Sequence, residues 1–172
     1  EGKLAAIGPG VERLGEEAAA LWPNARVATL SSDMYGSARA LKAEIAGIAR
    51  GAADIIIGTQ LVAKGLDVPN VTLVGVILAD VGLYLPDFRS GERSFGLLCQ
   101  VAGRAGRGAE PGRVIIQTYS PDNHAIVAAA EQDYAAMYRQ EIQGRRQLGN
   151  PPFNQLVHLI YQDTNATLCQ RQ

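Results

Sequence analysis

The sequence predicts an α/β layered domain with a mainly parallel sheet, and two observations lead to this fold class. Short apolar runs alternate along the chain with stretches of helical periodicity, which is the pattern of strand–helix units. The apolar runs are continuous, which is typical of strands buried on both faces of a parallel sheet. The composition agrees, because 47% of the 172 residues are hydrophobic and 19% are charged, a balance that supports a globular core.

Four strands are expected, separated by helices and followed by a long helical segment. The strands are expected at residues 26–30, 54–57, 71–79 and 113–119. The helices are expected at about 11–21, 38–50 and 92–105, with one continuous helical pattern from about 123 to 148. Pro151 and Pro152 then end this last helix, since proline cannot continue the helical hydrogen-bond ladder.

The pattern divides the chain into three parts. Residues 1–120 form the α/β lobe, and residues 121–150 form a long helical segment that packs on this lobe or links from it. Residues 151–172 are the truncated start of a further domain, with a strand at 158–161 and a polar tail that is partly disordered. We expect a fragment of a longer protein, because the chain begins at Glu1 without an initiator methionine.

Charge and cysteine usage exclude several classes of protein. The formal net charge is −1, so contact with phosphates must come from a few placed residues rather than from bulk charge. Cys99 and Cys169 lie far apart and form no CxxC pair, so neither a metal site nor a disulfide framework is expected. No apolar run approaches membrane-spanning length and the start has no signal-peptide pattern, so we expect a cytoplasmic protein without membrane contact.

The run at 100–107 (QVAGRAGR) carries the clearest chemical signal. On a continuous helix Gln100, Arg104 and Arg107 would be spaced i, i+4, i+7 and form one polar stripe. A guanidinium offers a fixed charge and a planar fork that matches phosphate oxygens, and two of them can neutralise charge on a transferred phosphoryl group. The two glycines of the run are poor helix formers, which makes sense if another backbone or a ligand comes close. The alternative is a solvated helix face with a glycine-rich end.

A second run, 58–67 (GTQLVAKGLD), directly follows the second expected strand. Ligands of open α/β sheets collect beyond the carboxyl ends of strands. Thr59 and Gln60 place hydroxyl, amide and N–H groups where they can reach a phosphate or a nucleic-acid backbone. Gly65 and Asp67 open the approach to the next strand, and the Asp67 carboxylate could accept a hydrogen bond from a ribose hydroxyl. The alternative is an ordinary βα loop in which Asp67 caps a turn.

Five charged residues lie between the third expected strand and the end of the arginine run. They could form a network that orients the arginine-bearing helix. The favoured interpretation is that they are helix caps and surface ion pairs of little energetic weight. These residues are Asp80, Asp87, Arg89, Glu92 and Arg93.

The two runs together resemble motifs V and VI of superfamily 2 helicases. Further phrases resemble one family among them, the primosomal replication-restart DNA helicases (primosomal protein N′). The phrase at 145–153, RRQLGNPPF, is the family-specific part. The other phrases lie at 8–13, 51–65, 86–89, 92–93, 114–119 and 133–134, so that the resemblance spans nearly the whole chain.

The resemblance implies a RecA-like three-layer lobe, the C-terminal of two helicase lobes that bind ATP between them. By position, Gly65 and Asp67 would face the nucleotide and Gln100 would couple the two sites. Arg104 and Arg107 would contact the γ-phosphate, and Arg107 is the residue most like an arginine finger.

The resemblance also implies partners and cofactors. Thr59 and Lys64 would contact the DNA backbone, next to Gln60. The family unwinds forked or single-stranded DNA at stalled forks and recruits primosome proteins. The implied partners are therefore DNA, the first helicase lobe in cis, primosome proteins and single-strand-binding proteins. ATP would bind with Mg²⁺ held by the first lobe, and the family's zinc module is absent from this chain.

Departures from the family leave two other interpretations open. The chain contains no GxxxxGK[ST] and no Asp-Glu-x-His, so it should not hydrolyse ATP alone. The segment 31–38 lacks the usual basic residues, Leu66 and Val68 replace His and Phe, and Asn150 replaces an aromatic residue, which indicates a divergent member. The alternatives are a lobe of another superfamily 2 translocase and a non-catalytic scaffolding lobe.

Overall fold

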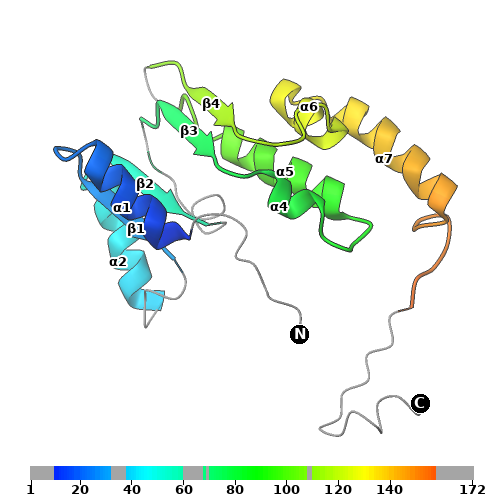
Figure 1. Ribbon diagram of the computed structural model, residues 1–172, viewed down its shortest axis with the longest axis horizontal. Coiled ribbons are helices and arrows are strands. Elements are labelled where there is room, and N and C mark those ends of the chain that lie inside the picture. Colours follow the sequence, from blue (N-terminus) through cyan, green and yellow to red (C-terminus); the bar gives the residue numbers. More distant parts are fainter. Residues whose placement is uncertain (1–9, 32–37, 60–67, 69, 108–109, 158–172) are drawn as a thin grey trace, which may run out of the picture.

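The computed structural model describes residues 10–31, 38–59, 68, 70–107 and 110–157 and confirms the α/β class. In Figure 1 the elements up to β2 gather in one half and those from β3 onward in the other. The helices are α1 (Val11–Leu21), α2 (Ala38–Ala49), α4 (Asp80–Leu83), α5 (Ser90–Ala102), α6 (His124–Glu131) and α7 (Tyr134–Leu148). The strands are β1 (Val27–Leu30), β2 (Ile55–Gly58), β3 (Leu73–Val76) and β4 (Arg113–Ile116).

The first half has three layers. Strands β1 and β2 pair in parallel, with Val27 opposite Ile55. Leu30 on β1 packs with Ile48 of α2, whereas Gly15 of α1 lies against the side chain of Thr29. Because successive side chains of a strand point to opposite faces, α1 and α2 cover opposite faces of this sheet.

The second half carries a larger core on one side of its sheet. Strands β3 and β4 pair in parallel, with Val74 opposite Val114. Helices α5 and α6 cover one face and α7 packs against these two helices. Phe95, Leu98 and Met137 are buried in this cluster, and Val76 and Ile116 pack against it. The other face leaves Leu73 and Ile115 exposed. In the described residues the four parallel strands therefore form two separate two-stranded sheets, where the sequence predicted one sheet.

The third and fourth strands are shorter than the predicted 71–79 and 113–119, since Asp80 turns the chain there. Asp80 begins α4 and is buried. Its carboxylate accepts hydrogen bonds from Thr118 Oγ1 at 2.9 Å and from the Tyr119 N–H at 3.0 Å. Beyond β4, the Gln117 N–H still donates to the Val76 carbonyl of β3 at 2.9 Å, and the next two residues bond to the Asp80 side chain.

The predicted continuous helix over 123–148 is wrong, because the chain breaks between α6 and α7. Gln132 adopts the left-handed conformation, with φ of 55°, and ends α6. The Asp133 side chain accepts from the Ala136 N–H and caps the start of α7, as aspartate does at helix N-termini. None of the helices within the described ranges has both the length and the apolarity to cross a membrane. The strand expected at 158–161 lies outside these ranges.

Candidate functional site

The arginine run leaves the helix earlier than its spacing predicted. Helix α5 ends at Ala102, and residues 103–106 form turns. Of the three polar residues, Gln100 therefore lies on the helix, and Arg104 and Arg107 lie beyond its end. The expected single helical stripe is wrong, because Gly106 takes a φ of 76°, which a right-handed helix does not accommodate. We call residues 103–107 the arginine turn.

Close backbone contacts fix the arginine turn and explain its glycines. The Gly106 N–H donates to the Val71 carbonyl at 2.9 Å. A Cβ on Gly106 would lie 2.8 Å from the backbone nitrogen of Gly112, and one on Gly112 would overlap Ala105. The prediction that another backbone comes close is confirmed for Gly106, whereas a Cβ on Gly103 would meet only carbonyls of α5, those of Cys99 and Gln100.

These contacts place the arginine turn at the amino edge of the β3–β4 sheet. Val71, which accepts from Gly106, lies just before β3. Arg113 begins β4 and its N–H donates to the Thr72 carbonyl at 2.8 Å. The two arginine side chains therefore leave the chain at the edge where both strands begin.

The two arginine side chains differ in exposure. Arg104 is half-buried and Arg107 is exposed. The Nε of Arg107 donates to the Gly103 carbonyl at 2.9 Å, which folds the side chain back over the end of α5. The structure thus brings both arginines into one turn, and the Arg107 side chain is bonded to the first residue of that turn.

Thr59 lies at a different edge from the arginines. It directly follows β2 and is exposed, at the carboxyl edge of the β1–β2 sheet. Four further predicted site residues fall outside the described ranges: Gln60, Lys64, Gly65 and Asp67. The segment that contains them begins after Thr59 and ends just before Val71, which is bonded to the arginine turn. The residues between Thr59 and Val71 in the sequence therefore connect the edge that carries Thr59 to the edge that carries the arginines.

The charged residues ahead of the arginine run have different partners. The Asp87 carboxylate accepts from the Arg89 N–H and guanidinium and pairs with Arg93 NH1 at 2.9 Å. Hydrogen bonds from Arg89 lower the pKa of Asp87 to about 2. Burial acts to raise the pKa of Asp80, but hydrogen bonds from Tyr119 and Thr118 outweigh it, so that the pKa is lowered.

Arg145 is a residue whose role the sequence did not predict. Its side chain is 15% exposed and pairs with Glu92 of α5 and Glu141 of α7. The family-specific phrase at 145–153 lies far along the sequence from the phrases at 86–89 and 92–93, and the structure brings them into contact. The resemblance marked both segments, but their separation along the chain hid the contact.

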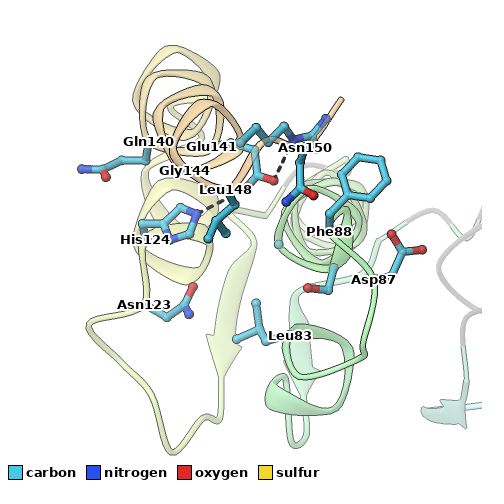
Figure 2. A pocket seen from close by; sticks show the side chains of 13 residues that line it. Leu83, Asp87, Phe88, Asn123, His124, Gln140, Glu141, Gly144, Leu148 and Asn150 are labelled. Atoms are coloured by element: carbon cyan, nitrogen blue, oxygen red, sulfur yellow. Dashed lines mark hydrogen bonds and ion pairs between the residues drawn. The ribbon is translucent and has the colours of Figure 1, made fainter. Parts of the chain in front are cut away.

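A cavity of about 250 Å³ opens beside this contact, between the α4–α5 turn and helices α5, α6 and α7. Figure 2 shows His124 and Glu141 facing one another in it, with Phe88 opposite. The His124 Nε2 lies 3.5 Å from Glu141 Oε2. Within the described ranges no group of three or more His, Cys, Asp or Glu residues is placed to hold a metal ion.

Comparison with known proteins gives consistent matches. Residues 8–109 match the family model described as helicase conserved C-terminal domain. The chain is similar to replication restart protein PriA of Bacillus subtilis, at 46% identity over 88% of this chain and 19% of that protein. The corresponding proteins of Chlamydia trachomatis and Synechocystis are 44% and 42% identical over 90% and 92% of this chain, and over 20% and 19% of their own length. The chain therefore spans about a fifth of the length of these relatives.

Proposed function

Because this chain belongs to the family of helicase conserved C-terminal domains, we propose that it is the second motor lobe of an ATP-dependent DNA helicase. The helicase would unwind DNA at stalled forks for replication restart and primosome assembly. The similarity to proteins named replication restart protein supports this choice over another superfamily 2 translocase. So does the family-specific phrase at 145–153.

The observation that carries the proposal is the fixed arginine turn. Its backbone is held by Val71 and Gly112, so its two arginines leave from a defined position. Gly65 and Asp67, which the resemblance assigns to the nucleotide, precede Val71 by only a few residues in the sequence. Preorganised cationic groups stabilise charge on a transferred phosphoryl group without reorganising during the reaction.

We assign a different contact to each of the two sheet edges, one with the nucleotide and one with DNA. Arg104 and Arg107 would contact the γ-phosphate of ATP, whose Mg²⁺ would be held by the first lobe, and Gln100 would couple this site to the DNA. Thr59, Gln60 and Lys64 would contact the DNA backbone. Residues 60–69 would then link the nucleotide-bound state to the contact with DNA. Without a phosphate-binding loop of its own the isolated chain should be inactive, and single-strand-binding and primosome proteins would act on the complete helicase.

The test is Arg107→Ala in the full-length protein that contains this chain. We expect DNA-stimulated ATP hydrolysis to fall by roughly 10³-fold, the scale of an arginine finger, while DNA affinity measured by fluorescence anisotropy is retained. Arg107→Lys keeps the charge but lacks the planar fork and should be intermediate. Arg139→Ala, which removes an exposed arginine from α7, is the matched control and should be unaffected. Near-normal turnover in Arg107→Ala would defeat the assignment.

The gene upstream of Glu1 gives a second test, directed at the scaffolding alternative. A GxxxxGK[ST] sequence there, followed by an acidic Walker B motif, supports a two-lobe motor. A stop codon shortly upstream would leave the arginines without a nucleotide to contact and would favour the non-catalytic lobe.

A further inference from the structure

The first turn of α5 is held in place by α7, and the contact is centred on one side chain. We propose that Arg145 is a positioning residue that fixes α5 and, through it, the arginine turn. The inference rests on the proposed function, because it concerns the placement of the arginines that would contact phosphate. Arg145 itself lies at the opposite end of α5 from these arginines and would not touch the nucleotide.

The guanidinium of Arg145 is engaged on all three nitrogens and on one face. NH2 donates to Glu92 Oε2 at 2.6 Å, and Nε donates to Glu141 Oε1 at 3.1 Å. NH1 points to the Pro151 carbonyl at 3.5 Å, and the group lies over the Phe88 ring, 5.0 Å from its centroid. A planar fork held in this way defines the positions of its partners, which a lysine ammonium would not do.

Close packing at the same point leaves α5 little room to shift. A Cβ added at Gly91, next to Glu92, would lie 3.2 Å from Glu141 Oε2 and 3.7 Å from Met137 Cε. The same Cβ would lie 3.8 Å from His124 Nε2. The start of α5 thus meets both α6 and α7, and the Arg145–Glu92 pair closes this junction on its exposed side.

Helix α5 connects this junction to the arginine turn. It is continuous from Ser90 to Ala102, 13 residues, or about 20 Å at the α-helical rise. A regular helix of this length moves largely as a unit, so a displacement of its first turn reaches Gln100 and the turn beyond. Misplacement of a phosphate-contacting group by about 1 Å can lower turnover roughly 10²-fold.

The same cluster also holds the chain that leaves α7. Arg145 contacts the Pro151 carbonyl, and the neighbouring Arg146 lies over the Phe153 ring at 4.8 Å from its centroid. Residues 151–153 therefore share a junction with α5. Any domain that follows would be attached where it can influence the position of the arginine turn.

The experiment uses the full-length protein with Arg145→Gln, Glu92→Gln and the double variant. We expect kcat for DNA-stimulated ATP hydrolysis to fall about tenfold in Arg145→Gln, with KM for ATP within about twofold, since the arginines act chiefly in the transition state. The double variant should be no slower than Arg145→Gln, because the two residues act through one contact. Arg145→Lys should recover part of the loss.

Thermal unfolding and two reference variants separate the outcomes. Arg139→Gln changes an exposed arginine on the same helix and should leave kcat unchanged. Unchanged kcat in Arg145→Gln overturns the inference. An equal fall in kcat in Arg139→Gln also overturns it. So does a fall in kcat that is explained by unfolding of Arg145→Gln at the assay temperature. Losses that are additive in the double variant also overturn it. If Arg107→Ala loses turnover while Arg145→Gln keeps it, the positioning role fails and the proposed function stands. If Arg107→Ala keeps turnover, the proposed function fails.

Discussion

The two halves of the molecule use the same parallel strand pairing but differ in how they are packed. Around β1 and β2, helices cover both faces of the sheet, yet the buried cluster in the described residues consists of Leu30 and Ile48. Around β3 and β4, helices α5 and α6 cover one face, and the buried cluster in the described residues extends from Leu83 through α5 and α6 to Met137 of α7.

The difference in packing bears on the two proposed contacts of the lobe, with the phosphate of ATP and with DNA. The arginine turn belongs to the half with the larger core, where backbone contacts fix it on two sides. Thr59 belongs to the half in which the described residues form the smaller buried cluster. Residues that must stabilise a transition state gain from rigid support, whereas a group that grips and releases a strand must move with each cycle. The packing therefore matches the proposed roles.

The largest effect on stability should come from shortening one buried leucine in each of the two cores. Leu98→Ala should cost roughly 3–5 kcal/mol of unfolding free energy, because its neighbours on α6 and α7 cannot collapse into the space. Leu30→Ala should cost less, roughly 2–3 kcal/mol, since among the described residues a smaller buried cluster surrounds it. Guanidinium unfolding of both variants measures the difference. Equal losses of unfolding free energy in the two variants would contradict the difference in packing between the two halves.

The next effect tests the backbone contact that fixes the arginine turn. Gly106→Ala combines a positive φ with a Cβ 2.8 Å from the Gly112 nitrogen, so it should destabilise by about 1–3 kcal/mol. Gly96→Ala is the matched control, because Gly96 lies on α5 with open space around it. That change should stabilise by about 0.5–1 kcal/mol, as alanine favours the helix. A Gly106→Ala variant as stable as the parent would mean that the turn can rearrange.

Lowering the pH should destabilise the half that contains β3 and β4, because Asp80 becomes protonated. Its pKa in the folded state is lowered below the ordinary value of 3.8, so its contribution is complete above that value and is lost as the pH falls through the folded pKa. Asp80→Asn should be less stable than the parent at neutral pH, and the two should converge under acid. Urea unfolding between neutral pH and pH 3 measures this, and a constant difference would contradict it.

The local features of the fold could be predicted from the sequence, whereas the contacts between distant segments could not. Continuous apolar runs predicted all four strands, and Gly106 in the run at 100–107 indicated the close approach that Gly112 supplies. The break at Asp133 was missed because a capping aspartate inside a helical pattern resembles an ordinary polar position. The Arg145–Glu92 contact joins residues 53 positions apart, and no periodicity along one element predicts a pair between two elements.

The smallest effect should come from the ion pair between Arg26 and Asp54, at the start of the β1–β2 sheet. The guanidinium NH2 lies 2.7 Å from the Asp54 carboxylate, with the two side chains 60% and 44% exposed. Solvent and salt screen such a pair, and the side-chain entropy lost in holding it offsets most of the attraction. Arg26→Gln should therefore leave the melting temperature nearly unchanged at physiological salt, with any difference disappearing at 1 M salt. Asp54→Asn should cost more, because Asp54 also accepts from the Arg26 backbone N–H at 2.8 Å, and this bond aligns the two strands. Equal effects of the two variants would show that the charge rather than the backbone contact supports the smaller half.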